Sequence, residues 1–506
     1  MKVSARLWTI LLIAASFFAG FVALRPIWDV DIFWHIVAGR WIIDTLSFPS
    51  TDIFTFITPP RAWVTFQWLY EVLMAGVDSA GGLAAVRVVN ALLHGAAFAA
   101  FALFASAALA KRSSGILPAA LAVALLFALY ADRVRVRPHV FNLLGWSLLL
   151  HTFFYSSRGL RARLITAAVI MAVWANMHAG GAFVFLMALL ALPAGAVVAK
   201  HLGEGSRWQA RFTVKEALGI WGLLAAVCAL SPNFLQGVWQ AWAMLGGSEM
   251  LIEEWLPFWH YFSAGTHPLH LLCGLLPLAA LAMVIWTTLR RGENRLDVVL
   301  FCVGACLLPF RSLRFVYHEA FVLVLVWSGL GGIRAASSLP LRLWPAGQGI
   351  LTVSLILAAL HLHGPAQYGT VGRWLQSYSE DLDQRRFPSE LVAPVLKVVE
   401  SSVERQPMSV FCLPNWGGYL LYHLYPKIRV IADGRGNFSE KLGRQLHFIY
   451  LYRHAYEHAA MIQRIYSESG ADMVVMQRPA FPRQYVPVQW LPVERSPKGE
   501  IWLRWR

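Results

Sequence analysis

The sequence predicts an all-helical polytopic membrane domain followed by a small α/β domain. Hydrophobic residues make up 58% of the 506 residues and charged residues only 14%, which is about half the charged share of soluble domains. Long apolar runs recur as far as residue 363 and are absent from 364–506. The 22 tryptophans agree with this class, because indole rings favour membrane interfaces. These observations argue against a soluble enzyme, a disordered chain, a coiled coil and a disulfide-stapled secreted scaffold.

Eleven apolar runs are predicted to cross the membrane as helices, because a spanning helix needs about 20 apolar residues. They are 7–24, 82–110, 115–131, 139–156, 164–180, 181–199, 216–231, 269–289, 297–310, 315–332 and 347–363. The first run follows Lys2 and Arg6, as in a signal peptide, but no small-x-small cleavage pattern follows it. We therefore expect it to be a retained helix.

The basic residues predict the orientation of these helices. With the N-terminus on the cytoplasmic side, the inner segments hold sixteen Lys and Arg residues and the outer segments hold eight. This bias follows the positive-inside rule, so the net charge of +15 calls for no nucleic-acid partner. We expect a multi-pass protein of the inner (cytoplasmic) membrane, with a cytoplasmic N-terminus and an extracytoplasmic C-terminal domain.

Two domains are predicted, a transmembrane domain at 1–363 with a long first outer loop at 25–81, and an α/β domain at 364–506. In the α/β domain, short apolar runs predict strands and amphipathic patterns predict helices. The strands are expected at 410–413, 429–431 and 473–476, and the helices at 440–450 and 454–466. In the first loop, the amphipathic stretch 33–46 is expected to lie along the membrane surface.

A D-x-D pattern opens the first outer loop. Asp29 and Asp31 stand two residues apart just beyond the first helix, and His35 would share a helical face with Asp31. Paired carboxylates can hold a divalent cation or act as a base, and His35 could complete a metal site. The alternative is that Asp29 or Asp31 caps the N-terminus of the following helix.

Two outer loops carry clustered arginines. Arg133, Arg135 and Arg137 alternate in the sequence, which on an extended strand places their side chains on one side, and His139 follows them. In a later loop, Arg311 and Arg314 lie one helical turn apart. Guanidinium groups bind phosphate in a bidentate manner, so these clusters indicate phosphate recognition. The alternative for the first cluster is salt bridges to lipid headgroups.

Two further outer segments carry polar side chains. Asn176 and His178 stand at a tight turn between two predicted helices. The segment 231–268 has no basic residue and carries Glu249, Glu253, Glu254, His260 and His267. Polar groups near membrane depth are costly and usually functional. Their gathering on one side of the membrane predicts a polar cavity that opens outward and that a lipid phosphate enters from the bilayer.

The C-terminal part contains the segment Asn415-Trp416-Gly417-Gly418-Tyr419 and, after it, a strand that ends at Asp433. Paired glycines allow a close approach of the backbone. Trp416 and Tyr419 could form a surface on which a sugar stacks or an acceptor docks. The alternative is that these rings anchor the core of a small domain. Asp433-Gly434 is an ordinary turn signal.

These elements resemble the GT-C class of membrane glycosyltransferases, and within it the catalytic subunit of oligosaccharyltransferase. The resemblance rests on the first-loop Asp29 and Asp31, and on the segment at 415–419 with the strand ending at Asp433, which match a W-W-D-Y-G element and its following strand. Gly417 stands where that element has Asp. The chain is also similar to uncharacterised bacterial membrane proteins that share the D-x-D-x-W-H and W-G-G-Y elements. The resemblance implies many spans, an outer C-terminal domain and polyprenyl-phosphate sugar donors.

The predicted function is that of an inverting glycosyltransferase at the outer membrane face. The expected partners are a lipid-linked sugar donor, an acceptor of unknown class and membrane lipids. Asp29 or Asp31 would act as base or as ligand of a divalent ion, Mg or Mn, and the arginines would hold the departing phosphate. The substrate would also be bound by His139, Asn176, His178, Trp416 and Tyr419. His139 and His178, together with His35, could also complete a metal site. The alternative function is that of a non-catalytic lipid-phosphate-binding transporter or an assembly protein of the cell envelope.

Overall fold

A computed structural model describes most of the chain. The described residues are 5–109, 116–203, 206–244, 257–259, 268–290, 294–328, 345–363, 365–402, 404, 406–436, 439–452, 458–477 and 489–504. They fall into two compact units. Unit 1 comprises 1–25, 87–238 and 252–379, and unit 2 comprises 26–86, 239–251 and 380–506. Each unit therefore combines segments that are far apart in the sequence.

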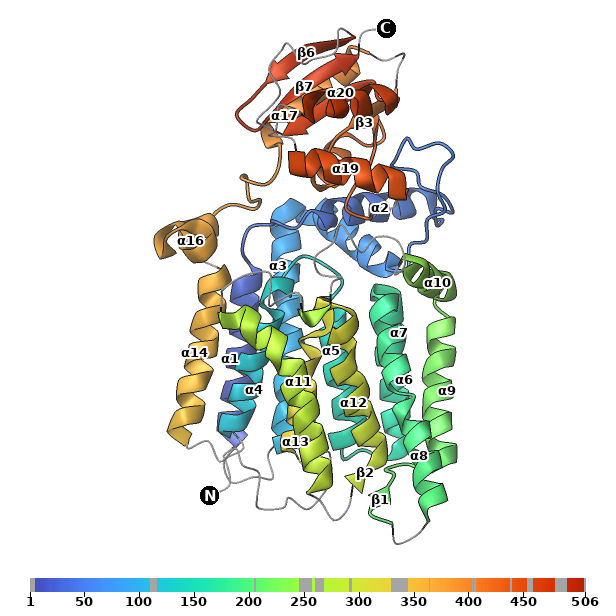
Figure 1. The fold of residues 1–506 in the computed structure, drawn as a ribbon, viewed down its shortest axis with the longest axis vertical. Helices are drawn as coiled ribbons and strands as arrows, with labels where there is room; N and C mark the ends of the chain where they lie inside the picture. Colours follow the sequence, from blue (N-terminus) through green and yellow to red (C-terminus); the bar gives the residue numbers. More distant parts are fainter. Residues whose placement is uncertain are drawn as a thin grey trace. The chain divides into compact units, whose positions relative to one another are not determined.

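Unit 1 is a set of apolar helices that run alongside one another (Figure 1). Its main helices are α1 (Ala5–Ala23), α4 (Ile116–Tyr130), α5 (Val140–Leu150), α6 (Leu160–Met177), α7 (Ala179–Ala188), α8 (Ala191–Leu202), α9 (Val214–Ala229), α11 (Pro268–Leu289), α12 (Leu296–Arg311), α13 (His318–Trp327) and α14 (Pro345–His363). The short elements are η1 (Ala131–Arg133), η2 (His151–Tyr155), η5 (Leu313–Phe315), β1 (Trp208–Gln209), β2 (Asn294–Arg295), α15 (Pro365–Tyr368) and α16 (Val371–Ser377). Helix α10 (Phe234–Met244) crosses from unit 1 into unit 2.

Local sequence signals explain several helix ends in unit 1. Helix α9 begins with a capping box, in which Thr213 and Glu216 each accept a hydrogen bond from the backbone N–H of the other. Such reciprocal bonds satisfy N–H groups that the first helical turn leaves unpaired. At the α6–α7 junction, the His178 Nδ1 accepts a hydrogen bond from the Gly181 N–H at 2.9 Å. Polar residues thus mark where the apolar helices start and stop.

The helical parts of the prediction agree with the structure. Each of the eleven apolar runs is mainly helical where its residues are described, and the run 181–199 is interrupted by a turn between α7 and α8. Within the described residues, four stretches are long and apolar enough to cross a membrane, namely Arg6–Ala23, Trp68–Leu109, Leu160–Met177 and Ala179–Leu202, and four shorter helices are also apolar. The chain is thus mostly helical with several apolar helices, while the number of eleven spans stays a prediction.

Large apolar side chains are exposed on the helices of unit 1. Ile10, Phe17 and Leu92 expose 59%, 74% and 66% of their surface. Soluble proteins rarely present contiguous apolar surface on this scale, whereas the outside of a membrane domain faces acyl chains. The exposed apolar side chains therefore agree with embedding in a bilayer.

Helix α3 (Trp68–Leu109) is broken at two glycines. Gly81 and Gly82 have non-helical dihedral angles, and Gly82 has a φ of 63°, in the region that favours glycine. The segment before the break belongs to unit 2, and Arg87 begins the part that belongs to unit 1. The predicted membrane span starts at residue 82, so the part of α3 before the break at Gly81 and Gly82 lies ahead of it.

Unit 2 is built on a five-stranded sheet in the order β4-β3-β5-β7-β6. The strands are β3 (Met408–Phe411), β4 (Ile428–Val430), β5 (Met473–Gln477), β6 (Trp490–Arg495) and β7 (Gly499–Arg504), and the helices are α2 (Asp31–Thr45), α17 (Ser389–Glu400), α18 (Pro414–Leu424), α19 (Glu440–Tyr452) and α20 (Ala459–Glu468). Strands β4, β3 and β5 are parallel, and β7 and β6 continue the sheet antiparallel. The strands and helices expected in this region from the sequence correspond to β3, β4, β5, α19 and α20.

The central strand β5 of the unit 2 sheet is buried on both faces, whereas the edge strand β6 is mostly exposed. Met473 and Val475 of β5 belong to one hydrophobic cluster, and Val474 and Met476 belong to another. Because side chains alternate along a strand, these two clusters cover opposite faces of the sheet. The first cluster also contains Trp63 of the first loop.

The first loop is part of unit 2 through its backbone. Thr55 forms a parallel bridge with Val430 of β4, the Val430 N–H donates to the Phe54 carbonyl at 3.0 Å, and the Phe56 N–H donates to the Val430 carbonyl at 3.2 Å. The segment thus extends the sheet beyond β4. The predicted domain boundaries at 1–363 and 364–506, and the extracytoplasmic side of the C-terminal part, stay predictions.

Candidate functional site

Three motifs that are far apart in the sequence meet in unit 2. These are the D-x-D pattern at the start of α2, the Gly417-Gly418 pair in α18 and the turn after Asp433. A Cβ atom added at Gly434 would lie 2.1 Å from Asp31 Oδ1, and one at Gly418 would lie 3.2 Å from the Val30 carbonyl oxygen. The absence of side chains at these glycines therefore allows the D-x-D segment to approach the backbone of the C-terminal part.

The structure gives the two carboxylates of the D-x-D pattern different environments. Asp29 is buried and its Oδ1 accepts a hydrogen bond from the Asp31 N–H at 2.9 Å, at the first residue of α2. This bond is an Asx turn just before the helix, whose N-cap residue is Val30, with no capping bond from a side chain. Asp31 is half-buried. Of the two, Asp31 is the carboxylate that solvent reaches.

His35 lies one turn into α2 and is 98% buried, its exposed fraction being 2%. Its Nδ1 lies 3.5 Å from the Gln67 Nε2 and 3.6 Å from the Glu71 Oε1. Within the described part of the chain, no three side chains of His, Cys, Asp or Glu lie together so as to hold a metal ion. The divalent ion expected at Asp29, Asp31 and His35 stays a prediction.

Glu71 is a fully buried carboxyl group before the break in α3. Among the described residues, neither of its oxygens makes a full hydrogen bond, and its polar neighbours are the ring of His35 and the amide of Gln67. Burial raises the pKa of Glu71 to about 8, against the opposing influence of the positive charge on Arg435. Glu71 is therefore mostly neutral at pH 7.

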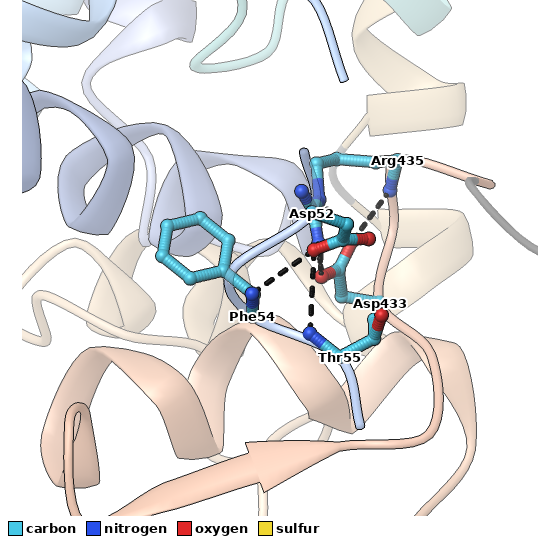
Figure 2. Close-up of polar contacts among 5 residues, drawn as sticks. All are labelled: Asp52, Phe54, Thr55, Asp433 and Arg435. Atoms are coloured by element: carbon cyan, nitrogen blue, oxygen red, sulfur yellow. Dashed lines mark hydrogen bonds and ion pairs between the residues drawn. The ribbon is translucent and has the colours of Figure 1, made fainter. Parts of the chain in front are cut away.

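A buried ion cluster fixes the turn after Asp433 (Figure 2). The Arg435 Nη2 donates to Asp433 Oδ2 at 2.6 Å and to Asp52 Oδ1 at 2.9 Å, and the Arg435 Nε donates to Asp433 Oδ1 at 2.8 Å. The guanidinium carbon lies 4.8 Å and 4.5 Å from the ring centroids of Phe54 and Trp63. Two carboxylates and two aromatic faces thus hold one guanidinium.

The electrostatics of this cluster favour its charged form. Burial alone would raise the pKa of Asp52, but the charge of Arg435 and the N–H groups of Phe54 and Thr55 outweigh it, so the pKa is lowered. Burial alone would lower the pKa of Arg435, but the charges of Asp433 and Asp52 raise it. Asp52 and Arg435 therefore stay ionised over the physiological pH range.

Trp416 and Tyr419, which were expected to bind substrate, are buried in unit 2, with 4% and 3% of their surfaces exposed. The Trp416 Nε1 donates to the Arg386 carbonyl at 3.2 Å. The ring of Tyr419 packs 5.0 Å from that of Phe33 and 5.2 Å from that of Phe387. This placement favours the alternative in which both rings anchor the core.

Helix α2 is held near its far end by a second polar cluster. The Arg40 Nη2 donates to Asp78 Oδ2 at 2.6 Å, and the Tyr422 hydroxyl donates to Asp78 Oδ1 at 2.9 Å. The first half of α2 is buried all round, which differs from the amphipathic pattern expected for 33–46. The reason is that α18 and the start of α3 both pack on α2, and a Cβ at Gly39 would lie 2.0 Å from the Glu71 carbonyl oxygen.

In unit 1, Arg133 ends the 3-10 helix η1 and residues 135–137 are bends, so the segment 133–137 is not the extended strand assumed for it. The N–H groups of Arg135 and Arg137 donate to the carbonyls two residues earlier, at 2.8 Å and 2.9 Å. Even so, Val134 and Val136 are buried while Arg133, Arg135 and Arg137 are half-buried. The alternation of side chains expected for the arginines is therefore present in a different backbone conformation.

Several of the predicted residues gather near this segment. The rings of His139 and His178 lie 5.4 Å apart, and Arg314 is close enough to His178 to interact with it electrostatically. Arg133 and Arg314 both act electrostatically on Tyr317. The structure thus brings one arginine from each of the two predicted clusters to the same tyrosine.

The other predicted residues of unit 1 are placed differently. Arg311 is exposed at the end of α12. Asn176 donates to the Ala172 carbonyl at 2.7 Å and accepts from the Ser231 hydroxyl at 3.0 Å, a bridge between two helix ends. The acidic and imidazole residues of 231–268, namely Glu249, Glu253, Glu254, His260 and His267, lie outside the described residues.

Sequence reasoning missed four residues of the unit 2 site, which are Asp52, Glu71, Gly434 and Arg435. Asp52 and Glu71 are acidic residues of the first loop that stand close in sequence to aromatic residues. An acidic residue among aromatic residues could have indicated a buried carboxyl group. The sequence Asp433-Gly434 predicts only a turn. The next residue, Arg435, could have indicated a salt bridge, but its partner Asp52 lies 383 positions earlier in the chain.

No protein-family model matches the chain, and no curated protein matches it. The solved structures that are similar along almost all of its length include two of one protein. One is ArnT from Cupriavidus metallidurans bound to undecaprenyl phosphate, at 14% identity and a TM-score of 0.47, covering 99% of this chain and 98% of that one. The other is apo ArnT from the same organism, at 12% identity and a TM-score of 0.46, with the same coverage. Likeness at this level supports no conclusion about activity, so the residues of the chain itself must carry one.

Proposed function

We propose that the protein transfers a sugar from a polyprenyl-phosphate-type donor to an acceptor at the outer face of the inner membrane. The observation that carries this proposal is the placement of Asp31. Its half-buried carboxylate stands at the start of a buried helix, with the backbone at Gly434 closing one side and Asp29 holding the first N–H of the helix. A carboxylate that is fixed in place and still reached by solvent suits a general base.

The proposed reaction is an inverting displacement. The Asp31 carboxylate accepts the proton of the acceptor hydroxyl, and the acceptor oxygen attacks the anomeric carbon of the donor. The bond between that carbon and the phosphate oxygen breaks, and the polyprenyl phosphate leaves with the bonding electron pair. Asp29 orients the helix start and takes no part in the proton transfer.

The arginines of unit 1 are proposed to bind the phosphate. One short segment carries the half-buried side chains of Arg133, Arg135 and Arg137. Arg314 lies close enough to Tyr317 to interact with it electrostatically, as Arg133 does. Guanidinium groups stabilise the negative charge that builds up on the leaving phosphate. A divalent ion, Mg or Mn, is a further part of the proposal. Such ions are often held by one or two carboxylates together with substrate phosphates, and Asp31 supplies a carboxylate.

The test is a transfer assay in proteoliposomes. The donor is a radiolabelled polyprenyl-phosphate sugar, and a total membrane-lipid extract serves as the acceptor. Asp31→Asn should abolish transfer and leave the binding of undecaprenyl phosphate unchanged, whereas Arg135→Ala with Arg137→Ala should weaken that binding. Asp44→Asn is the matched control, because Asp44 is an exposed carboxylate on the same helix. Transfer at the wild-type rate by Asp31→Asn would remove the base from the proposal.

The second candidate function is lipid-phosphate binding without catalysis, in a transporter or an assembly protein of the cell envelope. It is supported by the burial of Trp416 and Tyr419, which leaves the acceptor without an aromatic docking surface at these residues. Tight binding of undecaprenyl phosphate by a wild-type protein that transfers no sugar, with or without Mg or Mn, would favour this function.

A further inference from the structure

The turn that contains Gly434 confines the proposed base. A Cβ atom at Gly434 would lie 2.1 Å from Asp31 Oδ1, 3.2 Å from its Cγ and 3.4 Å from the Trp34 Nε1. The carboxylate therefore occupies the space that any other residue at this position would fill. If the turn moved away from Asp31, the carboxylate would lose this confinement. If it moved closer, the carboxylate would have to shift.

The conformation of this turn depends on its charged neighbours. The Asp433 Oδ1 accepts the backbone N–H of Arg435 at 3.0 Å, and the Gly436 N–H donates to the Asp433 carbonyl at 3.3 Å. Gly436 has a φ of 68°, where a side chain is strained. Asp433 is thus both part of the turn and an ion partner of Arg435.

Arg435 joins this turn to the first loop. Its side chain is 4% exposed, and its guanidinium pairs with Asp52 of the first loop as well as with Asp433. Asp52 is held in turn by the N–H groups of Phe54 and Thr55 at 3.0 Å and 3.3 Å. The first loop therefore contributes to both sides of the turn, with Asp31 against Gly434 and Asp52 against Arg435.

We propose that Arg435 is a positioning residue for Asp31, and that it acts by fixing the Asp433-Gly434 turn against the Asp31 carboxylate. This inference rests on the proposed function. Arg435 touches neither donor nor acceptor in this scheme. Its planar guanidinium satisfies two carboxylates at once, and a lysine ammonium, which is a compact charge on a flexible stem, does not reproduce that fork. A positive charge at position 435 is therefore not enough to hold the Asp433-Gly434 turn in place.

The first test measures turnover in the full-length protein, with Gly434→Ala, Arg435→Lys and the control Gly76→Ala. Gly76 lies in unit 2, and a Cβ there meets nothing within 4 Å. We expect Gly434→Ala and Arg435→Lys each to lower kcat about 100-fold, as misplacement of a reacting group by about 1 Å does. The KM for the donor and the binding of undecaprenyl phosphate should stay unchanged. A wild-type kcat in Arg435→Lys would overturn the proposal, because charge alone would then suffice.

The second test needs no turnover. In a background without native cysteines, Asp31→Cys is labelled with a water-soluble methanethiosulfonate reagent, alone and combined with each of the three substitutions. The labelling rate should change with Gly434→Ala and with Arg435→Lys, because both displace the turn that confines residue 31, and should stay constant with Gly76→Ala. Equal rates in all backgrounds would overturn the positioning role. Changed labelling rates, together with a wild-type protein that transfers no sugar in the proteoliposome assay, would support the positioning of residue 31 and overturn the transferase proposal.

Discussion

Replacement of Glu71 by glutamine should stabilise the protein, and the gain should grow as the pH rises. Burial raises the pKa of Glu71 to about 8 from its ordinary value of 4.5. The folded protein therefore keeps a proton on Glu71 between about pH 4.5 and about pH 8, where the unfolded chain has released it. Stability is full below the lower value and is lost as the pH rises through the higher one. Glutamine keeps the shape of the neutral carboxyl group and does not titrate.

The magnitude follows from the two pKa values. At about 1.4 kcal/mol per pH unit, the loss for wild type is about 1.4 kcal/mol at about pH 5.5 and about 4 kcal/mol at about pH 8. The difference in unfolding free energy between Glu71→Gln and wild type should thus widen by about 3 kcal/mol over this interval. Glu71 is fully buried, so solvent screening does not reduce this figure.

The assay is reversible unfolding in mixed micelles, followed by the fluorescence of the 22 tryptophans, at about pH 5.5 and about pH 8. Asp44→Asn removes an exposed carboxylate from the same unit and should change the unfolding free energy by less than about 0.5 kcal/mol at both pH values. If Glu71→Gln is no more stable than wild type at the higher pH, the folded state ionises Glu71 and compensates its charge, and the reasoning from burial is refuted.

Three further predictions concern packing and capping. Gly417→Ala should lower the unfolding free energy by about 1–3 kcal/mol, because its Cβ would lie 2.1 Å from the Ala432 carbonyl oxygen, while Gly372→Ala meets open space and should be tolerated; thermal denaturation compares the two. Tyr422→Phe removes a 2.9 Å hydrogen bond to Asp78 and should cost about 1 kcal/mol in the same assay; no loss would show that the bond is not formed in solution. Thr213→Ala and Glu216→Ala should each cost about 1 kcal/mol, and the double variant less than the two together, because the capping box is reciprocal; strict additivity would contradict it.

The helices of unit 1 could be predicted from the sequence because their signal is local. The apolar runs at 7–24 and 269–289 correspond closely to α1 and α11, since a run of apolar residues and its flanking polar residues define a helix without reference to the rest of the chain. The alternation of Arg133, Arg135 and Arg137 was likewise visible locally. The bends at 135–137 and the burial of Val134 and Val136 were not visible locally, because burial depends on neighbours from other parts of the chain.

The sequence does not predict which segments of the chain form unit 2, because the contacts of this unit join distant parts of the chain. Nothing in the residues around Thr55 indicates that they pair with Val430, and nothing around Asp433 indicates a second carboxylate on the same arginine. The D-x-D pattern is visible in the sequence, but the difference between a buried Asp29, which accepts the Asp31 N–H, and a half-buried Asp31 needed coordinates.

The joining of the first loop to the end of the chain also sets an order of events during synthesis. Asp52 and its ion partner Arg435 are 383 positions apart, so at about 5–20 residues per second the loop is made roughly 20 to 80 s before its partner leaves the ribosome. In that interval Phe54 and Trp63 lack the strands that later bury them. During this stage the nascent chain exposes its first loop to chaperones and proteases. Slower elongation between the two segments would lengthen the stage.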